Sequence, residues 1–408
     1  MRSIKIKIQR CLFVLILFFH CARYKAPMQP GIKQTGIPSS MPQYDIPWPS
    51  LANSPWPMYG HDPQHSCRSQ YQGPQKGELE WNSKPFDWSV RSGIAIGVEN
   101  TIYYLIYIYL MAINEDGSEK WRFACENRYA TILIASDNTI YAPSYDNNFY
   151  AINSDGTLKW KIYLGTAAGS PTIGLDGILY TISPNQNTLY AIKEAGVIWS
   201  IKLGSGFQGE CPAFSPDGAT LYVAGVDSSL YALTTSGNVK WKRKLDGRFW
   251  NGPMIDAQGN IYCAPRSTIL KLQSFDPNGN IRWEYQYGYM GHETQCLTMD
   301  RNGNIYFGAD GRIVALDYAG HLRWEAPYPA QMIFNSAGLA CDIEGTVYYG
   351  TAIKQFGVVA ILSTGLLKWA AEINLELLGA PDYNTPVIGR NQRLYRNTVP
   401  GKGVFCIK

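Results

Sequence analysis

Apolar and polar residues alternate in short runs along most of the chain, and glycine-containing turns separate these runs about every ten residues. Many runs contain an aliphatic residue followed by tyrosine, as in Ile102-Tyr103. Others contain Tyr-Ala followed by an aliphatic residue, as in Tyr150-Ala151-Ile152. Short runs rich in aromatic and β-branched side chains predict β-strands, and no apolar stripe with the 3.6-residue period of a helix accompanies them. The pattern predicts an all-β protein.

Tryptophan recurs at intervals of about 40 residues, which is the length of a structural repeat. A glycine stands four residues before most of these tryptophans. Pairs such as Asp116-Gly117 favour the tight turn of a hairpin, so each tryptophan is expected near the start of a hairpin's second strand. The recurring tryptophans are Trp81, Trp121, Trp160, Trp199, Trp241, Trp283, Trp324 and Trp369.

Each period holds four short strands, which together make one blade of a β-propeller. Trp81 marks a fourth strand that no first three precede, and residues 404–407 form a third strand that no fourth follows. We therefore predict an eight-bladed β-propeller of four-stranded antiparallel blades, with the last blade closed by the N-terminal strand around Trp81. Because the marker tryptophans occur in every blade, they are expected to pack between blades.

The N-terminus has the pattern of an export signal. Arg2, Lys5, Lys7 and Arg10 precede an apolar run over residues 11–19, and the first 20 residues contain no acidic side chain. This run is shorter than the roughly 20 residues that a membrane-spanning helix needs. A basic leader and a short apolar stretch predict a signal over residues 1–20 and an exported protein, periplasmic or associated with the outer membrane.

Cys21 follows the apolar run where a bacterial lipoprotein carries its acylated cysteine. We therefore expect lipid attachment at Cys21, with an ordinary cleaved signal and an uncleaved anchor as alternatives. Residues 21–57 are rich in proline and show no apolar period, which predicts an extended, mobile tether to the membrane. The propeller is expected over residues 58–408, with a lead-in at 58–76 and the closing strand at 77–84.

The charge distribution argues against nucleic acid as a partner. The formal net charge is +4, and the four basic residues of the leader account for all of it. The remaining chain is close to neutral, whereas nucleic-acid-binding domains carry a strongly basic surface. We expect no nucleic-acid binding.

Residues 150–160, with Tyr-Ala-Ile, a glycine turn and Lys-Trp, resemble the PQQ-like repeat. The resemblance runs from Trp81 to the C-terminus, and residues 56–66 are similar to the segment that precedes such repeats in many bacterial proteins. The superfamily includes quinoprotein dehydrogenases, which hold pyrroloquinoline quinone and calcium above the propeller axis. It also includes BamB-like lipoproteins of outer-membrane barrel assembly, which bind no cofactor and act by contact.

The chain lacks the adjacent cysteine pair of the quinoprotein dehydrogenases and is too short for their extended loops. We therefore expect neither pyrroloquinoline quinone nor calcium, and no enzymatic activity. The resemblance implies a monomeric binding or scaffolding protein of the cell envelope, with a role in outer-membrane protein assembly as one form of it and an envelope protein, peptide or glycan as the partner. The lead-in with His61 and His65 is not typical of the BamB branch. A quinoprotein dehydrogenase and a glycan-binding propeller remain the alternatives.

His61 and His65 flank Asp62 and could suggest a metal site. Pro63 argues against one helical turn presenting both imidazoles, so a capping or packing role is expected and no metal. The nine cysteines include no Cys-x-x-Cys pair, and the seven after Cys21 are scattered over different blades. They are expected to be mostly buried thiols, with one long-range disulfide left open.

The links from each tryptophan strand to the next blade converge on one face around the axis. In this chain they combine aromatic with polar and charged side chains, as protein-binding hot spots and sugar-binding funnels do. The alternative is that some of these aromatics fill the central channel. The predicted binding face comprises Trp88, Arg91, Arg128, Tyr129, Phe207, Gln208, Glu210, Arg248, Trp250, His292, Glu293, Phe334, Asn335, Asp382 and Tyr383.

Overall fold

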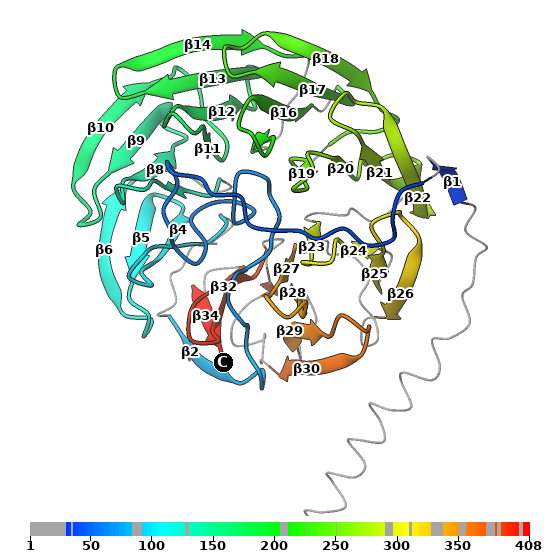
Figure 1. Cartoon of the computed structure of the whole chain (residues 1–408). Helices are drawn as coiled ribbons and strands as arrows, with labels where there is room; N and C mark the ends of the chain where they lie inside the picture. The colour runs from blue at the N-terminus through cyan, green and yellow to red at the C-terminus, as the bar shows by residue number, and fades with distance from the viewer. Residues whose placement is uncertain are drawn as a thin grey trace, which may run out of the picture.

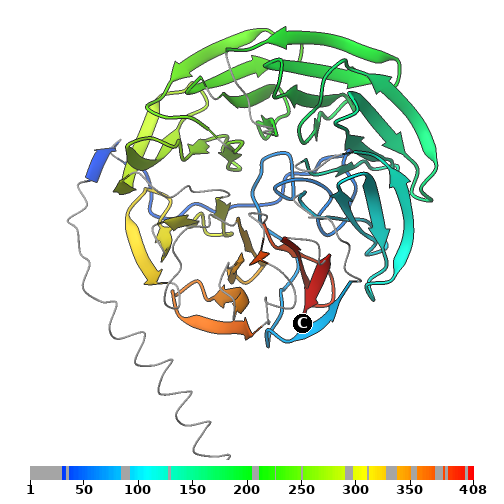
Figure 2. The ribbon, with the colours of Figure 1, turned by 180° about the vertical axis from the view of Figure 1, so that it is seen from behind.

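The computed structural model describes residues 30–33, 36–83, 92–126, 130–204, 211–225, 227–249, 251–289, 297–309, 312–327, 338–350, 356–372, 380–381, 385–399 and 403–408. These residues form eight antiparallel sheets arranged as a ring around a central axis (Figures 1 and 2). The prediction of an eight-bladed β-propeller is confirmed. Over the same ranges, no helix is long and apolar enough to cross a membrane.

In seven blades the four strands follow the chain from the axis to the rim. Blade 1 has β3 (Ala95–Ile96), β4 (Ile102–Ile106), β5 (Tyr109–Ile113) and β6 (Glu119–Ala124), and blade 2 has β7 (Leu133–Ile134), β8 (Ile140–Pro143), β9 (Asn148–Ile152) and β10 (Leu158–Tyr163). Blade 3 has β11 (Thr172–Ile173), β12 (Leu179–Ser183), β13 (Thr188–Lys193) and β14 (Gly196–Lys202), and blade 4 has β15 (Ala213–Phe214), β16 (Thr220–Gly225), β17 (Ser229–Thr234) and β18 (Val239–Lys244).

Blade 5 has β19 (Met254–Ile255), β20 (Ile261–Cys263), β21 (Ile269–Phe275) and β22 (Ile281–Tyr289), to which β1 (Pro30–Lys33) adds at the rim. Blade 6 has β23 (Thr298–Met299), β24 (Ile305–Ala309), β25 (Arg312–Leu316) and β26 (Leu322–Pro327), and blade 7 has β27 (Leu339–Cys341), β28 (Val347–Gly350), β29 (Phe356–Ile361) and β30 (Leu367–Glu372). Blade 8 joins β32 (Val387–Ile388), β33 (Leu394–Val399) and β34 (Val404–Ile407) to β2 (Leu79–Asn82), and β31 (Ala380–Pro381) pairs with β33.

The ring closes where both ends of the propeller sequence meet in blade 8. Strand β2 pairs with β34 in antiparallel register, with Leu79 opposite Ile407 and Trp81 opposite Cys406. The closing strand is therefore the one predicted around Trp81, and it covers the outer edge of β34.

The repeated tryptophans join each blade to the next. The indole of Trp81 donates to the carbonyl of Glu115 at 2.9 Å, and that of Trp121 donates to the carbonyl of Ser154 at 3.0 Å. Both acceptors lie in the hairpin turn of the following blade. The glycine in that turn has a positive φ, and a Cβ on Gly117 would lie 2.8 Å from the Trp81 ring. The recurring glycine is thus needed for both the turn and the indole, and the predicted packing between blades is confirmed.

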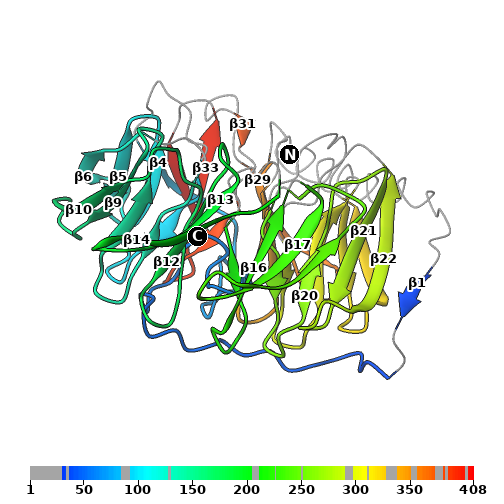
Figure 3. The same cartoon turned by 90° about the horizontal axis from the view of Figure 1, so that it is seen from above.

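Residues 36–76, which we call the strap, cross one face of the ring (Figure 3). This strap face is made by the turns between the first and second strands of each blade. The strap forms hydrogen bonds to all eight blades. In blade order, the bonds join Trp56 to Ile96, Ala52 to Ile134, Trp48 to Ile173, Pro63 to Phe214, Gln64 to Ile255, Ser66 to Thr298, Cys67 to Cys341 and Gln72 to Gln392.

The packing of the strap differs from the extended, mobile tether expected up to Pro57. Trp48, Leu51 and Trp56 are buried against the blades, and Trp48 donates its indole N–H to the carbonyl of Ile173 at 2.7 Å. The sequence of the strap shows no apolar period, because the strap binds through single aromatic side chains and backbone groups that do not recur at a fixed spacing. Both described parts of the predicted tether, residues 30–33 and 36–57, are therefore bound to the ring.

Candidate binding face and the strapped end of the axis

The face opposite the strap, which we call the link face, carries the described links between blades, such as residues 164–171, and the described hairpins between second and third strands. Of the predicted binding residues, only Arg248 lies among the described residues. The others fall outside the described ranges: Trp88, Arg91, Arg128, Tyr129, Phe207, Gln208, Glu210, Trp250, His292, Glu293, Phe334, Asn335, Asp382 and Tyr383, and so does the lipid-attachment candidate Cys21.

Arg248 is exposed in the link between blades 4 and 5. Its backbone forms a two-way bridge with Arg266, at 3.0 Å from the Arg248 N–H and 2.7 Å from the Arg266 N–H. Arg266 precedes β21 in the hairpin of blade 5, so this bridge fixes the link against the neighbouring blade. The next residue, Phe249, is buried in the apolar cluster between blades 4 and 5. Adjacent residues of one link thus divide between surface and core.

At the other end of the axis, successive carbonyls of the strap accept hydrogen bonds from the innermost strands. Pro63 and Gln64 accept from the N–H groups of Phe214 and Ile255 at 2.7 and 2.8 Å, in blades 4 and 5. Cys67 accepts from the N–H of Cys341 in blade 7 at 2.9 Å. The strap therefore turns around the axis as it passes from blade to blade and covers the ends of the inner strands.

His65 holds part of this turn in place. It is 4% exposed, and its Nδ1 donates to the carbonyl of Pro253 at 3.1 Å. Burial lowers the pKa of His65 to about 4, although Asp62 opposes the shift, so the imidazole is neutral at pH 7. Its ring also meets Tyr59 edge to face, with centroids 5.1 Å apart. The contacts are those of a packing residue.

Asp62 caps the same turn. Its Oδ1 accepts from the backbone N–H groups of Gln64 and Ser66 at 3.1 and 3.0 Å, and its Oδ2 lies 3.2 Å from His61 Nδ1. Burial alone would raise the pKa of Asp62, but the hydrogen bonds from His61 and Ser66 outweigh it and hold the pKa below its usual value. Within the described ranges, no three His, Cys, Asp or Glu residues gather as a metal site would require.

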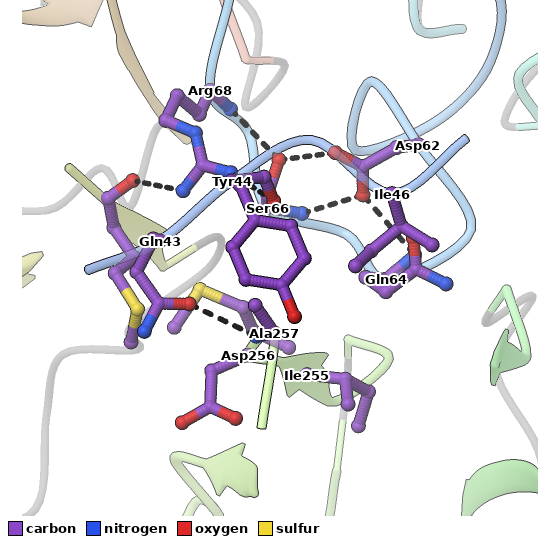
Figure 4. A pocket seen from close by; sticks show the side chains of 12 residues that line it. Gln43, Tyr44, Ile46, Asp62, Gln64, Ser66, Arg68, Ile255, Asp256 and Ala257 are labelled. Atoms are coloured by element: carbon purple, nitrogen blue, oxygen red, sulfur yellow. Dashed lines mark hydrogen bonds between the residues drawn. The ribbon is translucent and has the colours of Figure 1, made fainter. Parts of the chain in front are cut away.

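A small cavity of about 10 Å³ lies between the strap and blades 5 and 6, close to the space of one water molecule (Figure 4). Arg68 of the strap is 4% exposed there, and its guanidinium donates to Asp45 at 3.1 Å and to the Tyr44 carbonyl at 3.1 Å. Gln43 accepts from the Ala257 N–H at 2.9 Å. These side chains tie the strap to itself and to blade 5, so the cavity is a structural feature. Arg68 and Asp45 each occur once and belong to no repeat, so no periodic pattern marks them.

The six described cysteines are all buried, and none of the six is in a disulfide. Burial raises the pKa of the Cys125 thiol to about 12, so it stays protonated and unreactive at neutral pH. The six buried cysteines are Cys67, Cys125, Cys211, Cys263, Cys341 and Cys406.

The chain is similar to solved structures of two other proteins. The solved structure of BamB from Moraxella catarrhalis superposes with a TM-score of 0.59 at 17% identity, covering 80% of this chain and 98% of the other. An inactive virginiamycin B lyase from Staphylococcus aureus, solved with quinupristin, gives a TM-score of 0.48 at 18% identity over 66% and 94% of the two chains. No curated protein sequence matches.

A family match covers most of the repeat region. Residues 72–183 and 185–395 match the family described as outer membrane protein assembly factor BamB. The two matched segments span all eight blades, from the residues before the closing strand β2 to the second strand of blade 8. The chain therefore belongs to the BamB family of outer membrane protein assembly factors.

Proposed function

We propose that this protein is exported, is anchored to a membrane through an acylated Cys21, and serves as a non-catalytic scaffold in outer-membrane protein assembly. Its link face would bind another protein of the cell envelope. The observation that carries the proposal is the family match over the repeat region, because the family is described by its role in assembly.

The strap supports the choice of face. It bonds to all eight blades on the strap face and covers the ends of the inner strands there. A partner on that side would have to displace buried groups such as Trp48 and Arg68. On the link face, by contrast, Arg248 is exposed on a link whose backbone is fixed by Arg266. Arginine on a rigid support is a frequent contributor to protein-binding hot spots.

Crosslinking in living cells followed by pull-down tests the proposal. We expect the wild-type protein to recover envelope proteins, and the double variant Arg248→Ala/Trp250→Ala to lose them with little change in melting temperature. A matched control, Arg122→Ala/Tyr163→Ala, removes the same kinds of side chain from the rim of blades 1 and 2 and should keep the partners. If the link-face variant keeps its full partner set, the binding face lies elsewhere.

A further inference from the structure

The segment before the strap is attached at one place on the rim. Strand β1 pairs antiparallel with the outer strand of blade 5, with Pro30 opposite Tyr285 and Lys33 opposite Trp283 (Figure 1). From Cys21 to Pro30 the chain advances nine residues, which can span at most about 30 Å. A membrane that held Cys21 would therefore lie close to the rim of blade 5.

The neighbouring rim is the most basic described edge of the ring. The outer strand of blade 4, β18, carries Lys240, Lys242, Arg243 and Lys244 and no acidic residue. The next most basic described outer strand, β10, carries two lysines, and the remaining ones carry smaller positive charge, none, or a net negative charge. The body is close to neutral as a whole, so this concentration on one strand is local.

The period of two residues along a strand directs the three lysines of β18 to one side. Lys240, Lys242 and Lys244 are exposed, whereas Trp241 and Arg243 turn toward blade 5. The Trp241 indole donates to the Pro277 carbonyl at 3.1 Å, and the Arg243 guanidinium lies 5.3 Å from the centre of the Phe275 ring. Blades 4 and 5 are thereby in direct contact at the rim. The lysine side of β18 is the opposite side of that strand and faces away from blade 5, whereas blade 4 itself is the neighbour of the blade that holds β1.

Local carboxylates compensate only part of this charge. Lys242 lies 3.2 Å from Asp227, and its Nζ sits 4.8 Å from the centre of the Tyr231 ring. Lys240 donates to the hydroxyl of Thr220 at 2.9 Å, and Lys244 donates to the backbone carbonyl of Asp227. Of the three ammonium groups, only that of Lys242 forms an ion pair with a described residue, and Asp217 is a second carboxylate that interacts electrostatically with Lys240.

We infer that the lysine side of β18 binds the anionic headgroups of a membrane, so that the ring stands on its rim at blades 4 and 5. The position of the membrane rests on the anchoring that we propose for Cys21, whereas the affinity of β18 for headgroups does not. Exposed lysines near an anionic surface each contribute favourably, and their long side chains reach toward the headgroups. In this orientation the link face is directed along the membrane, toward neighbouring envelope proteins.

The test uses the full chain with Cys21→Ser, so that no acyl group contributes, and measures cosedimentation with vesicles. One set is phosphatidylcholine alone and the other is phosphatidylcholine mixed with phosphatidylglycerol. We expect Lys240→Gln/Lys242→Gln/Lys244→Gln to weaken binding to the anionic vesicles about 100-fold. The control Lys76→Gln/Arg323→Gln/Lys368→Gln removes three charges from other parts of the ring and leaves the leader unchanged. It should weaken binding by less than about threefold.

An equal loss in the two variants would mean that net charge drives the attraction and would overturn the inference, as would undiminished binding of the β18 variant. Loss of crosslinked envelope proteins with unchanged vesicle binding would show that β18 docks a protein, which also overturns it. Melting temperatures of both variants check that the ring is intact. Failure of the scaffold proposal itself would be seen in the link-face variant, which leaves β18 untouched.

Discussion

Arg393 and Glu80 form a two-pronged ion pair across the seam of the ring, with Nε–Oε2 and Nη2–Oε1 distances of 2.6 and 2.7 Å. Arg393 belongs to blade 8 near β33, and Glu80 belongs to the N-terminal strand β2. The same guanidinium bonds to Glu115 of blade 1 at 2.6 Å. One side chain thus joins three segments at the point where the ring closes.

Arg393→Ala should lower the free energy of unfolding by about 2 kcal/mol, because it leaves two partly buried carboxylates without their cation. Urea unfolding followed by tryptophan fluorescence measures the change. Arg122→Ala is the control, since its pair with Glu119 lies within one exposed strand and should contribute at most about 0.5 kcal/mol. Equal losses of stability in the two variants would mean that the ion pairs of Arg393 contribute no more than an exposed pair within one strand.

The seam also predicts a pH dependence. The hydrogen bond from Arg393 holds the pKa of Glu80 below its ordinary value of 4.5, although burial opposes this. A carboxyl with a depressed folded-state pKa stabilises the protein above its unfolded-state pKa, and the contribution is lost as the pH falls through the folded-state value. The stability difference between wild type and Arg393→Ala should therefore be constant from neutral pH down to about pH 5 and shrink below about pH 4.5. A difference that grows on acidification would contradict the assignment.

Trp48 tests whether the strap stabilises the ring. Trp48→Ala removes a buried indole and its hydrogen bond to Ile173, and should cost about 3 kcal/mol. Tyr44, four residues earlier, is 55% exposed, so Tyr44→Ala should change stability by less than about 0.5 kcal/mol. Thermal melts of the two variants decide the matter, and identical melting temperatures would show that the strap contributes nothing.

Gly117 and Gly177 separate backbone strain from the docking of tryptophan. Both have positive φ, of 84° and 77°, but a Cβ on Gly117 would meet the Trp81 ring at 2.8 Å, whereas one on Gly177 would meet nothing within 4 Å. Gly177→Ala should cost about 1 kcal/mol and Gly117→Ala at least about 2 kcal/mol. Chemical denaturation measures both changes in stability. Equal changes would mean that contact with the Trp81 indole does not add to the cost of the Gly117 substitution.

Cys21→Ser tests the proposed anchor. Without the thiol no acyl chain can be attached, so the variant should move from the membrane to the soluble envelope fraction. Immunoblotting of the fractions with an antibody to the propeller detects the change. Retention in the membrane with the leader still attached would instead indicate an uncleaved anchor.

The periodic parts of this structure could be predicted from sequence, because each blade repeats the same solution. Tryptophans equivalent to Trp121 and glycines equivalent to Gly156 recur in the repeats, because the indole packs on a glycine turn of the next blade that has no Cβ. The closing strand was predictable from the register of the same markers. Trp48 and Arg68 occur once each, and their partners lie on blades far away in the chain, so no period reveals them. Link-face residues also differ from blade to blade, so no period marks the ones that bind a partner. Of those predicted, only Arg248 lies among the described residues.

The seam between β2 and β34 also sets an order on folding. Strand β2 precedes all the complete blades in the chain, and its partner is the last strand of all. During synthesis, which proceeds from the N-terminus, the outer strand of blade 8 is made before the strand edge to which it pairs. The strap is likewise made before the blades that it contacts. Such a distant pairing is slow, because a loop of nearly the whole propeller must close before any contact rewards it. We therefore expect ring closure to come late in folding, and a chain interrupted before Val404 to keep an unsealed ring.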